Sequence, residues 1–495
     1  MGVALPESGV FLTVVAIGTS DGSRLAASLD EQTESTWELL IAEDGDASAA
    51  LATARGEVVM FLDGRDALTP DAAIAFRTFG EPDVGVLYAD EDLGDGRVSS
   101  AKPDFAPEWL RGQFYLDGPT AYRLELLRAL GPIALTRPGL YDLALRATER
   151  AVATGQRVVR IPSVLSTAGR PFTELDDQEL AAVTTVLTEH LARTGGGEVV
   201  DVRPWGLHST RRLMQGEPLV SVVIPTRGTR AEVRGESRVL VVDAVRGLIE
   251  RTDYDNLEFV LVIDAVAPDD VVDELRRLCG DRARFVTWDA PFSFSGKMNA
   301  GVLAASAELV LMLNDDIEVI DPGWLRAMVA LAQRPRTGLV GALLYFEDET
   351  IQHAGHVYSE TNVTHIGLGW PRGAAGPHGE LLVEREVTGV TAACALVSRS
   401  AFLEVGGFSP LLPESFNDVD LCMKLNLFGY QAYVTPAAEL YHFESKSRDP
   451  KLTEYETDTI WGRWEYAFGG ERFWHNPLGG MDHGPILNVR SVRGW

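Results

Sequence analysis

AELVLMLNDDIEV, at Ala307–Val319, joins a short apolar run to three polar residues. Similar apolar runs occur at Val220–Pro225, Leu257–Asp264 and Arg284–Trp288, and segments with helical periodicity separate them. Continuous apolar strands that alternate with helices are typical of a mostly parallel sheet that is covered on both faces. We therefore predict an α/β fold of Rossmann-like type.

The two halves of the chain contain the same succession of segments. Gly56–Asp66 is similar to Ala307–Glu318, and Val84–Asp92 is similar to Val340–Asp348, in the same order. A period of this length is too long for a solenoid and indicates a duplicated domain. The predicted divisions are a first domain at 1–171, a linker helix with short strands at 172–217, a second domain at 218–450, and an aromatic C-terminal extension at 451–495 that packs on the second domain.

The composition limits the partners of this protein. The 495 residues carry a net charge of −28, from 44 Lys and Arg against 72 Asp and Glu. Binding to nucleic acid or to an anionic membrane surface requires a basic footprint, so we expect neither. No apolar run reaches the ~20 residues that cross a bilayer, so we expect no membrane span.

The cysteines and the N-terminus indicate a reducing compartment. Cys279, Cys394 and Cys422 lack CxxC spacing, which favours neither a disulfide framework nor a zinc site. The N-terminal MGVALPESGVFLTVVAIG has no basic leader and no cleavage site, and we interpret it as the entry to a strand rather than a signal peptide. We therefore predict a cytoplasmic protein.

Polar residues follow three of the predicted strands, at Pro225-Thr226-Arg227, Asp264 and Asn314-Asp315-Asp316. Ligands of parallel α/β sheets bind beyond the carboxyl ends of the strands, so these loops are expected to converge on one crevice. Adjacent carboxylates repel one another unless a cation lies nearby, and a divalent ion with a diphosphate answers that need. The alternative interpretation is a solvated acidic turn.

Two further segments could carry chemistry. Asn417 resembles a helix N-cap, which places Asp418 in the first helical turn, where an anion is stabilised; this suits a catalytic base and equally suits capping. His442 follows an apolar strand, and Lys446 and Arg448 come soon after it. Cations near a metal suit a phosphate leaving group, whereas the plainer alternatives are a structural histidine and a solvated basic loop.

Seven segments together resemble family 2 of the GT-A glycosyltransferases, with the closest likeness to bacterial enzymes of surface-polysaccharide synthesis, including rhamnosyltransferase-like members. The resemblance covers essentially Leu219 to Arg448. Its segments are VSVVIPTRG, PFSFSGKMNAG, LMLNDDIEV, GALLYFEDETIQHAGHV, TGVTAACALVSRSAFLEVGGF, FNDVDLC and ELYHFESKSR. Any one of them is modest evidence, but seven in register make chance similarity very improbable.

The resemblance implies a role for each matching residue. Asp316 and His442 would hold Mn²⁺ or Mg²⁺, and Asp418 would be the catalytic base. Trp324 and Asn417 would contact the acceptor. The nucleotide-sugar would be bound by Pro225, Thr226, Arg227, Asp264, Asn299, Asn314, Asp315, Lys446 and Arg448.

The implied activity is that of a metal-dependent, inverting glycosyltransferase of the hexosyltransferase class. Asp418 would deprotonate an acceptor hydroxyl, which attacks the anomeric carbon of a nucleotide-diphosphate sugar. UDP is the expected nucleotide, with dTDP or GDP as alternatives, and the acceptor would be a glycan or a lipid-linked sugar that could hold the enzyme at the inner face of the membrane. Two other functions stay open: a sugar-1-phosphate nucleotidyltransferase and a non-catalytic glycan-binding scaffold.

The first half resembles the same fold but lacks the expected chemistry. Arg65 stands where the alignment places the metal ligand, and Leu140 stands where it places the base. Ile161–Ser166 offers no histidine that matches His442. We therefore predict a degenerate first copy, and we interpret the acidic segment Tyr88–Gly96 as a solvated loop.

Overall fold

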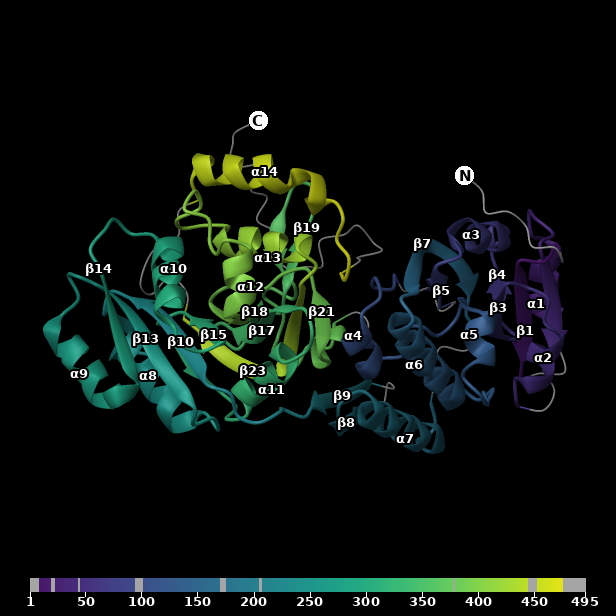
Figure 1. Cartoon of the computed structure of the whole chain (residues 1–495), viewed down its shortest axis with the longest axis horizontal. Coiled ribbons are helices and arrows are strands. Elements are labelled where there is room, and N and C mark those ends of the chain that lie inside the picture. The colour runs from purple at the N-terminus through teal and green to yellow at the C-terminus, as the bar shows by residue number, and fades with distance from the viewer. Residues whose placement is uncertain are drawn as a thin grey trace. The chain divides into compact units, whose positions relative to one another are not determined.

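The computed structural model consists of two compact α/β units, Met1–Arg211 and Arg212–Trp474. Figure 1 shows a sheet with flanking helices in each unit. The structure describes residues 9–18, 23–42, 45–93, 101–169, 175–203, 207–376, 379–443 and 452–474.

The first unit is built on a seven-stranded sheet of order β2-β1-β3-β6-β5-β7-β4. Strands β4 and β6 run against the direction of the other five. Its strands are β1 (Leu12–Ile17), β2 (Trp37–Ile41), β3 (Val58–Asp63), β4 (Ala67–Leu68), β5 (Val84–Asp92), β6 (Thr120–Arg123) and β7 (Arg157–Thr167). The mostly parallel arrangement is the predicted one.

Helices cover both faces of this sheet. Residues of α1 and α3 contribute to the core on one face, and residues of α2, α5 and α6 contribute to the core on the other. These helices, with α4, are α1 (Ser23–Asp30), α2 (Ser48–Thr53), α3 (Ala72–Phe79), α4 (Pro107–Gly112), α5 (Leu124–Arg128) and α6 (Arg137–Ala153). Strands that are buried on both faces explain the continuous apolar runs in the sequence.

The second unit is built on a ten-stranded sheet whose main path is β14-β13-β10-β15-β22-β17-β23-β16, with β18 paired to β17 and β21 paired to β23. Strands β10, β13, β14, β15, β17 and β23 share one direction. The strands are β10 (Val220–Thr226), β13 (Leu257–Asp264), β14 (Ala283–Trp288), β15 (Leu309–Leu313), β16 (Ile317–Val319), β17 (Thr337–Tyr345), β18 (Ile351–His353), β21 (Arg385–Val387), β22 (Cys394–Ser398) and β23 (Gln431–His442).

The helices of the second unit form two layers. Residues of α8, α9 and α11 enter the core on one face of the sheet, and residues of α10, α12 and α13 enter the core on the other. Their bounds are α8 (Leu240–Arg251), α9 (Asp269–Cys279), α10 (Phe294–Ala304), α11 (Trp324–Ala332), α12 (Arg399–Glu404) and α13 (Asn417–Leu427). Two hairpins, β11 (Arg230–Val233) with β12 (Glu236–Val239) and β19 (His356–Tyr358) with β20 (Val363–His365), lie outside the main sheet.

The two sheets have the same plan. When β1 to β7 are matched in chain order with β10, β13, β15, β16, β17, β22 and β23, both the strand order and the strand directions agree. The helical layers agree as well, because α1 and α3 correspond to α8 and α11, and α2, α5 and α6 correspond to α10, α12 and α13. This topology is what a duplicated domain requires.

The segment that we predicted as a linker is largely part of the first unit. It forms α7 (Asp177–Arg193), β8 (Gly197–Arg203) and β9 (Leu207–Arg212). A capping box at Asp176 and Glu179 begins the helix, and His190 holds it to α6 through a 2.6 Å contact between its Nδ1 and Glu149 Oε1.

The C-terminal helix α14 (Glu454–Phe468) packs on α13 in the second unit. Trp464 Nε1 and Arg463 both donate to the buried carboxylate of Asp420, at 2.9 and 2.6 Å. Residues 475–495 of the predicted aromatic extension lie outside the described residues. Among the described residues, no helix has the length and apolar character needed to span a bilayer.

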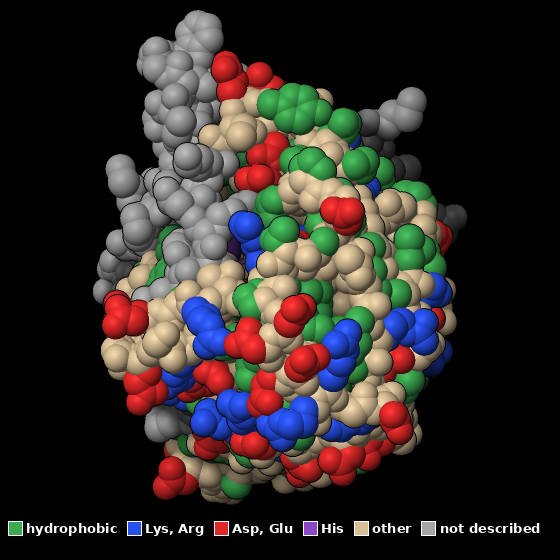
Figure 2. Space-filling model, turned by 90° about the vertical axis from the view of Figure 1, so that its left-hand side faces the viewer, with side chains coloured by type: hydrophobic (Ala, Val, Ile, Leu, Met, Phe, Trp, Pro, Cys, Tyr) green, Lys and Arg blue, Asp and Glu red, His purple; other side chains and the backbone are tan. Residues whose placement is uncertain are grey.

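Figure 2 shows one face of the second unit, on which acidic and basic side chains are interspersed. Helix α9 contains ion pairs of this kind, for example Arg277 with Glu274 at 2.6 Å and Arg276 with Asp273 at 2.9 Å.

Candidate active site

The predicted strand-end loops of the second unit converge at one edge of the sheet. Thr226, the last residue of β10, donates a hydrogen bond of 2.6 Å from Oγ1 to Asp315 Oδ2, in the loop after β15. Asp264 ends β13, and its carboxylate forms ion pairs with Lys297 of α10 and with Arg227, whose Nε lies 3.3 Å away. Side chains from three neighbouring strands are thereby linked.

Asp315 is buried beside a second buried carboxylate, that of Asp316. Burial, reinforced by the charge of Asp316, raises the pKa of Asp315 to about 7, although Thr226 and Lys297 act in the opposite direction. The adjacent acids thus repel one another in a site of low dielectric, which is the condition under which a bound cation is most strongly stabilised.

Asp316 and His442 meet across two paired strands. Asp316 directly precedes β16, and Ile317 pairs with His442 at the end of β23, so that Asp316 Oδ1 lies 3.2 Å from His442 Nε2. The same oxygen is buried and has no hydrogen-bond partner. An unsatisfied buried carboxylate oxygen needs a physical reason, and a metal ligand is one.

Gln352, a residue that the sequence did not single out, orients the imidazole of His442. Its Oε1 lies 2.7 Å from His442 Nδ1, which therefore carries the proton. The lone pair is then on Nε2, to which Asn314 Nδ2 donates at 3.0 Å. A lone pair and a carboxylate oxygen that face one another at 3.2 Å repel, and a divalent cation between them removes that repulsion.

Asp418 lies in the first turn of α13, with its side chain 21% exposed. Backbone N–H groups hold both carboxylate oxygens: Val419 donates to Oδ1 at 2.8 Å, and Ala392 donates to Oδ2 at 3.3 Å. The carboxylate is thus fixed in orientation and remains partly open to a ligand.

The segment before β22 connects Asp418 with the loop 314–316. Ala392 N donates to Asp418, and the next carbonyl, of Ala393, accepts a 2.9 Å hydrogen bond from the backbone N–H of Asn314. The acidic residue of α13 and the loop 314–316 therefore border the same two residues, as a common site requires.

Three predicted site residues have structural partners of their own. Asn417 begins α13 rather than capping it, since the cap residue is Phe416 in the left-handed conformation, and its Nδ2 donates to Glu414 O at 3.1 Å. The Asn299 amide makes two 2.9 Å hydrogen bonds with the backbone of Phe408. Pro225 is half-buried in β10. Their roles toward a ligand stay predictions.

The prediction that Trp324 contacts the acceptor is wrong. Its side chain is fully buried in the core beneath α11, and its Nε1 donates to Thr252 Oγ1 at 3.0 Å. The aromatic ring anchors the start of this helix and offers no surface to a ligand. Lys446 and Arg448 lie outside the described residues.

In the first unit, the structure corrects the residue that corresponds to Asp316. Val58 pairs with Arg123 as Leu309 pairs with Ser398, so Leu62 corresponds to Leu313. Four residues, 63–66, then precede β4, whereas three, 314–316, precede β16. The counterpart of Asp316 is therefore Asp66 and not Arg65, which is exposed and pairs with Asp63 at 2.7 Å.

Asp66 differs from Asp316 in its partners. Its two oxygens accept backbone hydrogen bonds from Gly169, at 2.6 Å, and from Asp63, at 3.0 Å. Ala67 pairs with Thr167, the residue that takes the place of His442. The expected histidine is thus replaced by threonine, and the carboxylate is satisfied by the chain itself.

The interpretation of the acidic segment Tyr88–Gly96 as a solvated loop is wrong where the structure describes it. Asp90 and Glu91 are buried in β5. Asp90 pairs with Arg160 at 2.6 Å, and Glu91 lies 3.5 Å from the buried Nζ of Lys102. Residues 94–96 lie outside the described residues.

Comparison with known proteins shows which protein family the second unit resembles. Residues 221–406 match the family described as Glycosyl transferase family 2. The chain therefore contains a glycosyltransferase domain of family 2, which has the GT-A fold, and the resemblance found in the sequence is confirmed. The matched residues include the strand-end loops and the 391–393 segment of the site.

Three relatives are similar to this chain, and two of them carry functional names. The chain is 36% identical over 445 residues to the uncharacterized protein y4gI of Sinorhizobium fredii, covering 84% of this chain and 48% of the relative. It is 31% identical to the O-antigen biosynthesis protein RfbC of Myxococcus xanthus, over 92% of this chain and 36% of the relative. It is 33% identical to the N-acetylglucosaminyl-diphospho-decaprenol L-rhamnosyltransferase of Mycobacterium tuberculosis, over 34% of this chain and 58% of that protein. The matched part of the chain thus spans between 36% and 58% of the length of these relatives.

Proposed function

We propose that the second unit transfers a sugar, with inversion, from a nucleotide-diphosphate sugar to a hydroxyl acceptor in the synthesis of a bacterial polysaccharide or glycoconjugate. The observation that carries the proposal is the buried, unsatisfied Asp316 Oδ1 that faces His442 Nε2 at 3.2 Å. Carboxylate and imidazole ligands at the ends of parallel strands are suited to a cation that binds diphosphate.

The residues present fit Mn²⁺ or Mg²⁺. Asp316 supplies a carboxylate, His442 supplies an oriented lone pair, and Gln352 fixes the tautomer. When bound, the cation supplies electrostatic stabilisation of the diphosphate that leaves. Imidazole favours Mn²⁺ over Mg²⁺, since Mg²⁺ prefers oxygen ligands.

The other residues of the site have separate roles in this proposal. Asp418 accepts the proton of the acceptor hydroxyl, because its carboxylate is the partly exposed one and is held by two backbone N–H groups. Asp264 and Arg227 form a charged pair at the strand edge that suits the base and ribose. The buried Lys297 forms an ion pair with Asp264 and holds its carboxylate in place.

The first unit has a non-catalytic role in this proposal. Each oxygen of Asp66 accepts a backbone hydrogen bond, Thr167 replaces the histidine, and the sequence alignment places Leu140 of α6 at the position of Asp418. A copy without the base and without an ion-binding pair is suited to contacts with the acceptor or with other proteins.

The donor and the acceptor are inferred from the class of enzyme alone. UDP-sugars are the first candidates, followed by dTDP- and GDP-sugars. A lipid-linked or growing glycan is the proposed acceptor, because two relatives are named for O-antigen synthesis and for a decaprenol-linked rhamnosyl transfer.

The test is the release of nucleoside diphosphate from a panel of UDP-, dTDP- and GDP-sugars, with Mn²⁺, Mg²⁺ or a chelator. We expect turnover only with a cation, and we expect Asp316→Ala to lower it by about 100-fold or more, since a metal ion is worth several kcal/mol. Asp66→Ala is the matched control in the first unit and should leave the metal dependence unchanged. Equal losses in the two variants would refute the assignment of catalysis to the second unit.

A further inference from the structure

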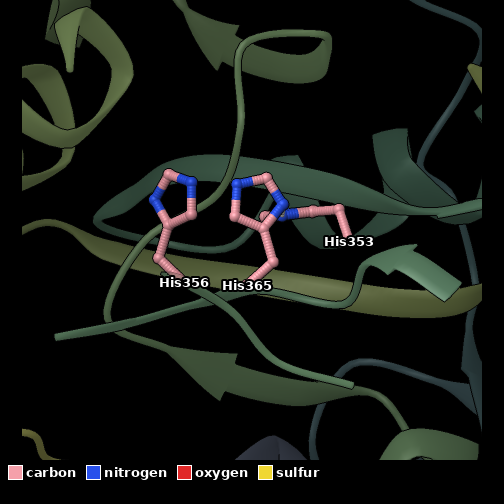
Figure 3. Close-up of side chains that lie close together, drawn as sticks. All are labelled: His353, His356 and His365. Carbon is pink, nitrogen blue, oxygen red and sulfur yellow. Dashed lines mark hydrogen bonds between the residues drawn. The ribbon is translucent and has the colours of Figure 1, made fainter. Parts of the chain in front are cut away.

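Three histidines come together in the second unit outside the residues assigned so far. His353 ends β18, His356 begins β19, and His365 ends β20. One nitrogen of each ring can be chosen so that the three atoms lie within 4.8 Å of one another. Figure 3 shows the rings of His356 and His365 side by side, with His353 next to His365. His353 and His356 are buried, and His365 is partly buried.

From this cluster we infer a second metal site, in which His353, His356 and His365 bind a transition-metal cation of the zinc class. Three neutral imidazoles with one further position match the geometry of His-rich zinc sites. The site differs from the Asp316–His442 pair in chemistry, because it offers nitrogen rather than oxygen ligands, and it does not depend on the proposed transferase activity.

The second nitrogens of two rings have the partners that metal-binding histidines need. His356 Nδ1 lies 3.1 Å from the hydroxyl of Tyr358, and His365 Nδ1 lies 3.0 Å from the backbone carbonyl of Gln352. A proton on each Nδ1 puts the lone pair on Nε2. Donation of the other N–H to a hydroxyl or carbonyl is the arrangement that fixes the tautomer of a metal ligand.

Two of the three rings have a lowered pKa, which favours the neutral form that a metal ligand needs. Burial lowers the pKa of His356 to about 4, and it lowers the pKa of His353 well below its usual value, with the neighbouring histidines acting in the same direction. Three imidazoles this close cannot all be cations, so lone pairs are available at neutral pH.

Two contacts in this cluster compete for one ring nitrogen, His365 Nδ1. The backbone N–H of Thr391 donates to His353 Nε2 at 3.2 Å, which puts the proton of a neutral His353 on Nδ1. His353 Nδ1 lies 3.2 Å from His365 Nδ1, which also faces the carbonyl of Gln352. His365 Nδ1 cannot accept from His353 and donate to Gln352 at once. Binding of a cation to His353 Nδ1 ends this conflict, at the cost of the contact with Thr391.

Asp418 borders the cluster. Its Oδ2 lies 3.9 Å from His356 Nε2, which is too far for a hydrogen bond. A cation on the three histidines thus lies beside the proposed base and leaves its carboxylate to accept a proton, with water in the fourth position of a tetrahedral site.

The test measures bound metal and needs no substrate. In Asp316→Ala, which removes the first site, we expect one equivalent of Zn²⁺ per chain after desalting, and visible absorption bands of tetrahedral Co²⁺ when Co²⁺ replaces it. Adding His356→Ala or His365→Gln should weaken Zn²⁺ binding by about 100-fold or more and abolish those bands, since even outer partners of a metal are worth about 10–100-fold. His190→Ala, a buried histidine of the first unit, is the matched control and should keep the metal.

Two results would overturn the inference. One is an Asp316→Ala protein that retains no Zn²⁺ and gives no Co²⁺ bands, which makes the cluster a hydrogen-bonded network only. The other is unchanged metal content in both His356→Ala and His365→Gln. His365→Gln keeps a polar side chain of similar size at a partly buried position, so it also covers the case in which His356→Ala does not fold. Loss of transferase activity with intact metal content bears on the proposed function and not on this site.

Discussion

The two units place a carboxylate at the same point of the same sheet, but with opposite chemical outcomes. In the first unit, each oxygen of Asp66 accepts a backbone hydrogen bond, and threonine takes the place of the histidine. In the second, Asp316 Oδ1 is buried without a hydrogen bond and faces an oriented imidazole. The fold therefore determines where the carboxylate lies. Its hydrogen-bond partners decide whether it is a structural group or is available as a ligand.

The neighbouring charges extend the contrast. In the first unit, Lys102 Nζ donates to the carbonyl of Asp117 and lies 3.5 Å from Glu91, and Arg137 lies 3.7 Å from the Asp117 carboxylate. The chain thus provides its own cations there. Among the described residues of the second unit, the buried Lys297 is paired with Asp264, and Asp316 faces the imidazole of His442 instead of a Lys or Arg side chain.

The largest effect should come from the base position. Asp418→Asn removes the proton acceptor and keeps the shape of the side chain, so turnover should fall by about 10²–10⁴-fold while the nucleotide-sugar still binds. Leu140→Ala, at the matched position of the first unit, should leave the turnover of the folded protein unchanged. Steady-state kinetics of both variants, with nucleotide binding measured by calorimetry, check this. Full activity of Asp418→Asn would contradict the base assignment.

The next effect concerns the stability of the first unit. Burial raises the pKa of Asp66 from 3.8 to about 6. A carboxyl whose pKa is raised in the folded state stabilises the fold fully below pH 3.8, and this contribution is lost as the pH rises through about 6. Relative to Asp66→Asn, the wild type should therefore lose up to about 3 kcal/mol of unfolding free energy between pH 4 and pH 7. Urea unfolding of both proteins across this range measures it, and parallel curves would show that Asp66 is ionised throughout.

The smallest effect tests the partner of the imidazole. Gln352→Ala removes the acceptor that fixes the tautomer of His442, and Mn²⁺ affinity should fall by about 10–100-fold. Gln333, whose amide contacts the backbone of Gln215 at 2.7 and 2.8 Å, gives the matched control, and Gln333→Ala should keep the affinity. Metal titration followed by turnover distinguishes them. Equal affinities in the two variants would remove Gln352 from the site.

The strands could be predicted closely from the sequence. Leu257–Asp264 has the predicted bounds, because a strand buried on both faces leaves an uninterrupted apolar run that a polar residue ends. The convergence of Thr226, Asp264 and Asp315 also follows from topology, since neighbouring parallel strands end at one edge. These features depend on local pattern and on general rules of sheets.

Other features depend on contacts between distant segments, and the sequence does not display them. Gln352 precedes His353 in a short strand, and nothing in its spacing indicates that it reaches His442. His353 and His356 are three residues apart in the sequence, but only the pairing of β19 with β20 brings His365 to them. The acidic neighbours of Asp90 suggest a surface loop. The sequence does not show that Asp90 pairs with Arg160, because that arginine lies on another strand.

The remaining errors have local causes. Trp324 follows a polar helix start, and only the packing beneath α11 shows that its indole is enclosed. The assignment of Arg65 failed because an alignment without gaps does not reveal that the first unit has one more residue before β4. Matching the strand patterns of the two halves does not detect a difference of one residue in a loop between strands.

That additional residue has an evolutionary consequence. Asp66 still precedes β4 as Asp316 precedes β16, so the longer loop has not displaced the carboxylate from the strand end. Ala67 pairs with Thr167 as Ile317 pairs with His442, so the pairing of the strands is also preserved. A sheet of this kind therefore tolerates an inserted codon in a loop, and the chemistry of its edge can change by substitution at single positions while the layers that fold it stay the same.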